Sequence, residues 1–216
     1  MDVNITLINE RYLIQNPIGK GGMGIVYRAT DRLSGQNIAL KQVIDPAADS
    51  VLSSTSRSID KRLALAQEFQ LLASLRHPHI ISVLDYGFDA QRLPYFTMDL
   101  LENPVTVTEY CLDLSTDGKL QALVDILQAL KYLHRRGILH RDLKPANILV
   151  ANGQLKVLDF GLAIVHEQHQ GDKTSTSGTL AYMAPELLTG NSASESSDLY
   201  AVGVVAYELF SGRHPF

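Results

Sequence analysis

Short apolar stretches rich in β-branched residues and bounded by turn residues dominate the first hundred positions. Such stretches are typical of β-strands, and they predict strands at residues 12–18, 25–30, 37–43, 80–86 and 93–100. Residues 58–76 differ, because Leu65, Phe69, Leu72 and Leu75 recur at helical spacing and form one apolar stripe. They predict an amphipathic helix. Residues 45–57, rich in Ser, Ala and Asp, predict a mobile loop.

The second half of the chain is predicted to be mainly helical. One helix is expected to begin with Asp117 as its N-cap and to end before Gly137. Its expected core face consists of leucines: Leu120, Leu123, Leu127, Leu130 and Leu133. A short strand is predicted at residues 155–158. Residues 199–210 form an apolar run that is too short to span a membrane and predicts a buried helix. Asp198 opens this helix, where it is expected to be the N-cap and could also brace the backbone of the loop at residues 138–149.

Composition narrows the class of protein. The chain has 216 residues, of which 45% are hydrophobic and 19% charged, as in folded proteins with one large domain or two small lobes. A net charge of −4 gives no indication of nucleic-acid binding. The single cysteine, Cys111, excludes an internal disulfide and suits the cytoplasm. No signal peptide or membrane segment is visible.

Residues 138–149 place reactive side chains between apolar flanks, which is typical of a loop held rigidly over a site. Asp142 can accept a proton, Lys144 can neutralise anionic charge, and the Asn147 carbonyl can ligate a hard cation such as Mg²⁺. Asp159 follows twelve residues after Asn147. Two carboxylates, an amide and a lysine predict metal-assisted phosphoryl transfer.

The sequences HRDLKPAN at residues 140–147 and DFG at residues 159–161 resemble the catalytic loop and metal-binding turn of eukaryotic-type serine/threonine protein kinases. The resemblance implies an α+β fold with two lobes. An antiparallel sheet lobe would cover residues 1–98, a hinge residues 99–103, and a C-terminally truncated, mainly helical lobe residues 104–216. It also implies ATP, and Mg²⁺ with Mn²⁺ as a substitute, as cofactors.

The glycine-rich segment at residues 19–24 is shared by two classes of nucleotide-binding protein. In a Rossmann fold a helix follows the glycines, whereas residues 25–30 here predict a strand, so the glycines should form the tip of a hairpin. No P-loop motif is present. The segment's wording is most similar to that of bacterial kinases. The resemblance implies that nucleotide is held by Ile18, Gly19, Lys20, Gly21, Gly22, Met23, Gly24, Val26, Ala39, Lys41, Met98, Asp99, Leu101, Asn147 and Asp159.

The resemblance also implies individual roles. Lys41 would reach the α- and β-phosphates and pair with Glu68 of the predicted helix. Met98 would line the back of the adenine pocket, and the hinge backbone at Asp99 and Leu101 would bond the adenine edge. The catalytic set is then Asp142, Lys144, Asn147, Lys41 and Glu68, and the metal ligands are Asn147 and Asp159.

Residues 159–186 correspond to an activation segment that ends in the motif APE. Thr174 or Thr176 is the expected site of autophosphorylation, and Arg141 is a natural partner for that phosphate. Thr179 and Lys144 are features of the Ser/Thr branch, so the expected acceptor is a serine or threonine hydroxyl of a protein.

The resemblance runs from about residue 11, but family members continue beyond the point where this chain stops. The missing helices supply an arginine that pairs with Glu186, so this carboxylate is expected to lack that partner. Three functions stay open: an active Ser/Thr kinase, a nucleotide-binding scaffold without turnover, and a small-molecule phosphotransferase. Self-association through the small lobe is a further expectation.

Overall fold

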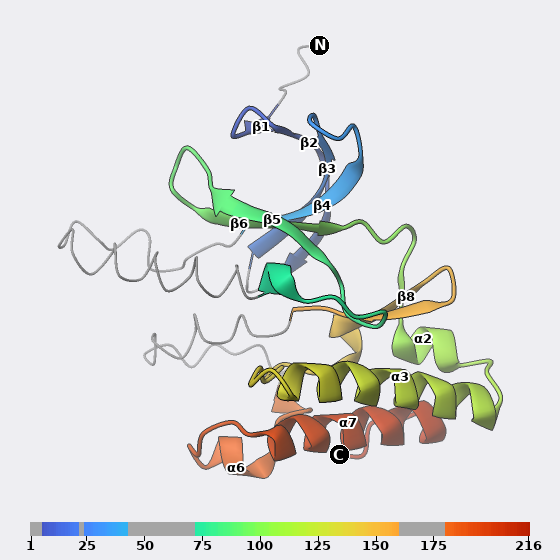
Figure 1. Ribbon diagram of the computed structural model, residues 1–216. Helices are drawn as coiled ribbons and strands as arrows, with labels where there is room; N and C mark the ends of the chain where they lie inside the picture. The colour runs from blue at the N-terminus through green and yellow to red at the C-terminus, as the bar shows by residue number, and fades with distance from the viewer. Residues whose placement is uncertain (1–5, 22–23, 43–71, 160–179) are drawn as a thin grey trace. The chain divides into compact units, whose positions relative to one another are not determined.

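The computed structural model describes residues 6–21, 24–42, 72–159 and 180–216. The chain divides into two compact units. Unit 1 comprises Met1–Leu75 and Ser82–Leu101, and unit 2 comprises Arg76–Ile81 and Glu102–Phe216. An antiparallel sheet dominates the first and helices dominate the second (Figure 1). The α+β class predicted from the sequence is confirmed.

Six strands form the sheet in the described part of unit 1, in the order β1-β2-β3-β4-β6-β5. They are β1 (Leu7–Ile8), β2 (Tyr12–Gly21), β3 (Gly24–Asp31), β4 (Asn37–Gln42), β5 (Val83–Phe88) and β6 (Pro94–Asp99). Every neighbouring pair is antiparallel. Gly21 faces Gly24 at the end of the β2–β3 ladder. The prediction that the glycines form the tip of a hairpin rather than the start of a helix is therefore confirmed.

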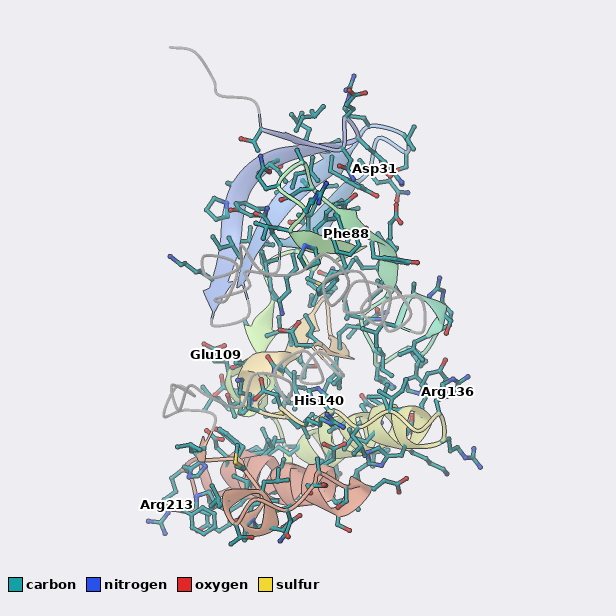
Figure 2. The ribbon with its side chains drawn as sticks, turned by 90° about the vertical axis from the view of Figure 1, so that its left-hand side faces the viewer. Asp31, Phe88, Glu109, Arg136, His140 and Arg213 are labelled. Carbon is teal, nitrogen blue, oxygen red and sulfur yellow. The ribbon has the colours of Figure 1, made fainter. Side chains whose placement is uncertain are left out.

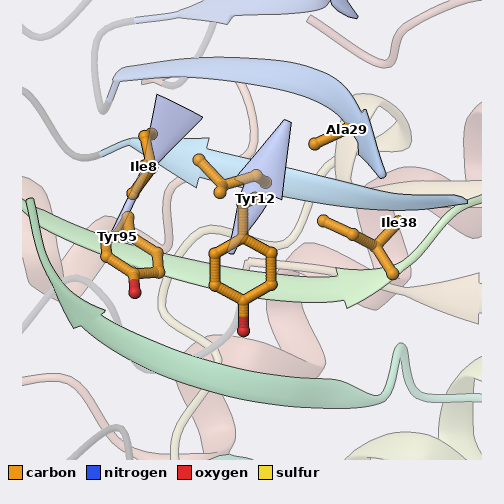
Figure 3. Packing of buried hydrophobic residues seen from close by; sticks show 6 residues of the cluster. Ile8, Tyr12, Ala29, Ile38 and Tyr95 are labelled. Atoms are coloured by element: carbon orange, nitrogen blue, oxygen red, sulfur yellow. The ribbon is translucent and has the colours of Figure 1, made fainter. Parts of the chain in front are cut away.

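One face of this sheet carries a hydrophobic core. Ile38 and Leu40 of β4 are buried there with Tyr12, Tyr95 and Ala29 (Figure 3). Because side chains alternate between the two faces of a strand, the residues between and beyond Ile38 and Leu40 must point to the opposite face. The burial of Ile38 and Leu40 on one face of β4 thus determines which side chains of this strand lie on the opposite face.

A partly buried ion-pair network closes unit 1 at its N-terminal end. The Arg11 guanidinium donates from Nε and one NH₂ group to the two Asp31 oxygens at 2.8 and 2.9 Å. Its other NH₂ group donates to Asp85 at 2.7 Å, and the Tyr12 hydroxyl donates to the same oxygen at 2.8 Å. Arg11 holds the pKa of Asp31 well below its usual range. The network joins β2, β3 and β5, and Figure 2 labels Asp31 at its end of the sheet.

Helices and a small sheet make up the described part of unit 2. The elements are β7 (Val105–Thr106), α2 (Val107–Cys111), α3 (Thr116–His134), the 3₁₀ turn η2 (Pro145–Asn147), β8 (Ile148–Ala151), β9 (Gln154–Val157), α6 (Pro185–Leu188) and α7 (Glu195–Ser211). Helices α3 and α7 run side by side (Figure 1). Among the described residues, none of the helices combines the length and apolarity that a membrane span requires.

The predicted cap of helix α3 is wrong. Ser115 is the N-cap, and its hydroxyl accepts from the Gly118 N–H at 3.3 Å, whereas Asp117 lies in the first turn. A carboxylate in the first turn still interacts favourably with the helix dipole. The sequence offered several capping residues close together, and local propensity did not distinguish between them.

The predicted core face of α3 is also partly wrong. Leu130 and Leu133 are buried as expected, but Leu120 and Leu127 are 46% and 38% exposed. The other buried positions are Ala122, Ile126 and Ala129. Two alanines on the buried face allow close packing, so the helix is rotated away from the leucine stripe that the sequence suggested.

Strands β8 and β9 form a hairpin whose turn is Asn152-Gly153. Both turn residues have positive φ, 51° and 74°, as a two-residue type I′ turn requires. The sequence prediction found only the second strand, at 155–158. Val157 of β9 also makes an isolated parallel bridge with Ile80. The hairpin thereby positions both ends of the segment from Asn147 to Asp159.

The remaining strand predictions agree with the structure within a few residues, except that residues 80–86 become β5 at Val83–Phe88. Of the helix predicted at 58–76, residues 58–71 lie outside the described ranges, as does the loop predicted at 45–57. Leu72 and Leu75 at its end are buried, at 4% and 1% exposure.

Candidate active site

The loop at residues 138–149 brings the Asp142 carboxylate into direct contact with its two other reactive side chains. The Lys144 ammonium lies 3.0 and 2.8 Å from the two Asp142 oxygens. The Asn147 amide nitrogen donates to the Asp142 carbonyl at 2.7 Å and to the carboxylate at 3.0 Å. Asp142 is therefore held in one orientation by a cation and an amide. The η2 turn, with Pro145 at its start, sets the spacing of these groups.

Helix α7 holds this loop by its backbone. The Asp198 carboxylate accepts from the His140 N–H at 2.8 Å and from the Arg141 N–H at 2.9 Å. Arg141 has φ = 68°, a conformation that costs a non-glycine residue about 1–3 kcal/mol and persists only where neighbours impose it. The prediction that Asp198 braces this loop is confirmed. Its predicted role as N-cap is wrong, because Ser194 caps α7.

His140, labelled in Figure 2, lies in the interior of unit 2 and is fully buried. Burial lowers its pKa, although the nearby carboxylates of Asp198, Asp142 and Asp159 each act in the opposite direction. The imidazole is therefore neutral at physiological pH. The carboxylates of Asp142 and Asp159 thus both act electrostatically on this one buried side chain.

Asp159 follows β9 closely. The backbone N–H of Leu158, which lies between them, donates to the main-chain carbonyl of Asn147 at 2.9 Å. This bond ties the start of the predicted metal-binding turn to the end of the loop. Asp159 has φ = 58°, a second strained position near the site. The sequence thus separates Asn147 and Asp159 by a hairpin, and the fold brings their backbones together again.

The chemistry of these groups fits a hard divalent cation. Asn147 is 7% exposed, and its amide nitrogen already bonds Asp142, which leaves its carbonyl oxygen for a ligand. With the Asp159 carboxylate it would supply two oxygen ligands, the type that Mg²⁺ prefers. Within the described ranges, no group of three or more His, Cys, Asp or Glu side chains could hold a metal ion. Such a two-ligand site is typical of Mg²⁺ that is completed by phosphate oxygens and water.

In unit 1, strand register collects the residues expected to hold nucleotide. Gly19 faces Val26, Val26 faces Lys41, and Ala39 faces Met98 across adjacent strands. Directly opposed residues share a face, and Ala39 and Lys41 are two apart on β4, so all five lie on the face opposite the hydrophobic core. Lys41 is only 4% exposed, and its ammonium lies 5.9 Å from the Phe96 ring centroid. Burial of a strand lysine is unusual and indicates a specific role.

The edges of this face are formed by the glycine hairpin and by the end of β6. Ile18 and Lys20 are exposed on β2, and a Cβ added at Gly21 would meet no described atom within 4 Å. Asp99 ends β6, and its N–H donates to the Ser82 carbonyl at 3.1 Å. Leu101 is the last residue of unit 1. The predicted hinge residues therefore lie where the chain passes from one unit to the other.

Several predicted residues lie outside the described ranges: Gly22, Met23, Glu68, Thr174, Thr176 and Thr179. Their roles stay predictions. The same holds for the convergence of the unit 1 and unit 2 residues on one nucleotide.

The end of the predicted activation segment is anchored to α7 by two bonds that the sequence did not reveal. The Ser197 hydroxyl donates to Glu186 at 2.7 Å, so Glu186, although expected to lack its family partner, has one within this chain. The Tyr182 hydroxyl donates to Glu208 at 2.8 Å, and burial together with this bond raises the pKa of Tyr182. Both partners lie on a helix that follows in sequence, and no motif marks Ser197.

The protein kinase domain family matches residues 12–216 of this chain. The chain is 37% identical over 220 residues to a probable serine/threonine-protein kinase of Streptomyces coelicolor, covering 97% of this chain and 31% of that protein. It is 38% identical over 222 residues to the serine/threonine-protein kinase PknA of Mycobacterium tuberculosis, covering 99% of this chain and 49% of that protein. The chain thus spans about a third to a half of these relatives.

A solved structure agrees with these sequence relationships. The PknI kinase domain of Mycobacterium tuberculosis, solved as a cysteine-to-alanine mutant, is 28% identical to this chain and superposes with a TM-score of 0.73. The similarity covers 98% of this chain and 77% of that domain. Fold and sequence therefore lead to the same family.

Proposed function

Because this chain belongs to the protein kinase family, we propose that it is a catalytic domain that transfers the γ-phosphate of ATP to serine and threonine hydroxyls of proteins. Curated relatives that carry the name serine/threonine-protein kinase support the reaction class. The boundaries that we propose are residues 1–98 for the small lobe, 99–103 for the hinge and 104–216 for the residues of the large lobe.

The observation that carries this proposal is that Asp142 lies within 2.7–3.0 Å of both the Lys144 ammonium and the Asn147 amide nitrogen, on a loop braced by α7. Phosphoryl transfer depends mainly on positioning and charge stabilisation, and this arrangement supplies both. Asp142 would orient the acceptor hydroxyl and take its proton. Lys144, which holds the Asp142 carboxylate, would also offset the charge of the transferred phosphoryl group.

We propose that Asn147 and Asp159 bind Mg²⁺, with Mn²⁺ as a substitute. The cation would neutralise phosphate charge when bound. In unit 1, the hairpin at residues 18–24 would cover the phosphates and Lys41 would bind the α- and β-phosphates. Glu68 would pair with Lys41. Val26, Ala39 and Met98 would contact the adenine, whose edge would bond the backbone at Asp99 and Leu101.

Regulation would act through the activation segment. We propose that Thr174 or Thr176 is autophosphorylated and that Arg141 pairs with the phosphate, with Thr179 contributing to Ser/Thr selectivity. Intact-mass analysis after incubation with ATP should show added phosphate, and peptide mapping should place it between residues 160 and 179. Phosphate confined to other segments would reject this assignment.

We propose that the reaction takes place in the cytoplasm, where ATP is available. We also propose self-association through the small lobe, and Leu33, which is 78% exposed on the turn between β3 and β4, offers a position at which to test it. That turn is ordered, because Asp31 accepts from the Leu33 N–H and the Ser34 hydroxyl. Sedimentation of the chain and of Leu33→Glu should show a dimer that the variant weakens. Two monomers of equal sedimentation would reject this interface.

Transfer of label from γ-labelled ATP to a generic protein, compared between the chain and Asp142→Asn, tests the main proposal. We expect label on protein with the unaltered chain and a loss of orders of magnitude with the variant. Nucleotide binding without label in either sample would instead support a scaffold. Label on small metabolites alone would support a small-molecule phosphotransferase.

A further inference from the structure

Basic side chains from three separate segments gather at one place in unit 2. Arg136 follows the end of α3, Lys156 lies on β9, and His77 lies in the segment Arg76–Ile81. Burial lowers the pKa of His77, and repulsion by the nearby charges of His79, Lys156 and Arg136 lowers it further. The chain as a whole has a net charge of −4, so this concentration of positive charge is local.

The ring of Tyr132 positions two members of this cluster. The Arg136 Cζ atom lies over the ring, 3.7 Å from its centroid, and the centroid of the His77 ring lies 4.9 Å from it. Tyr132 is itself held by α3 and by its hydroxyl, which accepts from the backbone N–H of Arg76 at 2.9 Å. Arg136 is exposed (Figure 2). A guanidinium that stacks on a ring directs its N–H groups outward around its edge, where they can donate to a ligand.

The other two side chains present donors as well. His77 Nδ1 accepts from the His79 N–H at 3.2 Å, so the neutral ring carries its proton on Nε2. The neighbours of Lys156 on β9 are 4% and 0% exposed, so Lys156 points to the opposite face of the strand. Among the described residues, neither Arg136 nor Lys156 forms an ion pair, and the Asp125 carboxylate lies 3.5 Å from His79 Nε2 instead.

We propose that Arg136, Lys156 and His77 form a docking site for a segment of a partner protein that carries phosphoserine or phosphothreonine. The site goes beyond the proposed reaction, because it consists of residues that the reaction does not use. A phosphorylated side chain carries about −1.5 to −2 charges and three acceptor oxygens at pH 7, which match a group of cationic donors. The guanidinium can bind such a phosphate through two parallel hydrogen bonds.

Other cations near the end of α3 show that the helix alone does not explain this cluster. Positive charge in this position interacts favourably with the helix dipole, and Lys131 and Arg135 share that interaction. These two residues line the groove between α3 and α7. Arg136 instead stacks on Tyr132, on the side where His77 lies. The dipole of α3 gives no reason for basic residues of other segments to converge there.

The segments that carry the site are joined by their backbones. The Val157 N–H donates to the His79 carbonyl at 2.9 Å, and the Ile81 N–H donates to the Val157 carbonyl at 3.0 Å. The segment with His77 and the strand with Lys156 therefore hold each other in place. A phosphate would meet donors that are already positioned, so little ordering would oppose its binding.

NMR titration of the 216-residue chain with a glycine–serine peptide that carries one phosphoserine tests the proposal. Bound phosphate should raise the pKa of His77, because a nearby anion stabilises the imidazolium. The same peptide with serine in that position should leave this pKa unchanged, and with glutamate it should bind at least about tenfold more weakly. Equal binding of the phosphoserine and glutamate peptides, or no change at His77, would overturn the proposal.

Two double variants separate the site from the charge of the whole chain. Arg136→Gln/Lys156→Gln should weaken binding of the phosphopeptide at least about tenfold. In the free variant the pKa of His77 should rise, because the repulsion by two cations is lost. Lys131→Gln/Arg135→Gln removes the same charge from the α3–α7 groove and should match the unaltered chain in both measurements.

Two results with these variants would contradict the docking site. An equal loss of affinity in both would mean that net charge alone attracts the peptide. An unchanged pKa of His77 in Arg136→Gln/Lys156→Gln would mean that the three side chains do not act on one ligand position. Neither measurement needs catalysis, so a chain that transfers no phosphate would reject the proposed function and leave this test intact.

Discussion

Replacing Asp198 with asparagine tests how the loop at residues 138–149 is held. The amide has one acceptor oxygen, whereas the carboxylate serves three donors with two oxygens. The orientation that loses least keeps the amide oxygen at the Oδ2 position, where it faces His134 and the His140 N–H. The amide nitrogen then faces the Arg141 N–H, donor against donor.

The magnitude follows from that single lost acceptor. A buried donor left without a partner costs about 1–3 kcal/mol, and here the donor belongs to a residue in a strained conformation. We therefore expect Asp198→Asn to lower the free energy of unfolding by about 1–3 kcal/mol. Kinase activity should fall at least tenfold in buffer where the variant is still folded, because Arg141 adjoins Asp142.

Urea unfolding followed by the helical circular-dichroism signal measures this change. Glu195→Gln is the matched control, since Glu195 lies in the first turn of the same helix with its side chain 65% exposed. This substitution should change stability by less than about 0.5 kcal/mol. An Asp198→Asn variant that unfolds at the same urea concentration as the control would refute the reasoning.

Three further substitutions test other parts of the fold. Arg11→Met should destabilise the chain by about 1–2 kcal/mol at pH 7, and urea unfolding at pH 7 and pH 3 should show the difference shrinking in acid. The sign follows from Asp31, whose pKa is lower in the folded protein than in the unfolded chain. The ion pair therefore stabilises the fold at pH values above the unfolded-state pKa, and this stabilisation is lost as the pH falls. A larger stability difference between the two proteins at pH 3 than at pH 7 would contradict this reasoning. Ser197→Ala removes the donor to Glu186 and should lower the thermal midpoint by a few degrees, with Ser197→Thr as the variant that keeps a hydroxyl. Gly153→Ala should cost about 1 kcal/mol in urea unfolding because φ is 74°, and no loss would contradict the turn assignment.

Local patterns predicted much of unit 1. The β-branched stretch after the glycines distinguished a hairpin from a helix, and the structure pairs Gly21 with Gly24 accordingly. Strand β4 was predicted to within one residue because apolar residues surround Lys41. The family and the class of reaction were recognisable because eight consecutive residues around Asp142 match the catalytic-loop motif of the family.

Element ends were harder to predict. Ser115 and Ser194 cap α3 and α7, whereas Asp117 and Asp198 were predicted to begin these helices. Ser, Thr and Asp are all good capping residues, so their order along the chain does not decide which one is used. The β8–β9 hairpin is a different case, because only its second strand was predicted although the sequence contains an Asn-Gly pair, which is a strong signal for a hairpin turn.

Long-range polar partners were beyond reach of the sequence. His134 and Asp198 are 64 residues apart, and Arg11 and Asp85 are 74 residues apart. No periodicity links such positions, because each pair is joined only by the packing of separate elements. The bracing role of Asp198 could be inferred from its place at the start of an apolar helix, whereas no pattern in the sequence linked His134 to it.

Phosphoamino-acid analysis of a protein substrate after incubation with γ-labelled ATP and Mg²⁺ tests the central claim most directly. The account predicts label on phosphoserine and phosphothreonine, with none when the label is on the α-phosphate or when Asp159→Asn replaces the unaltered chain. Label on tyrosine alone, or transfer that Asp159→Asn leaves unchanged, would contradict it.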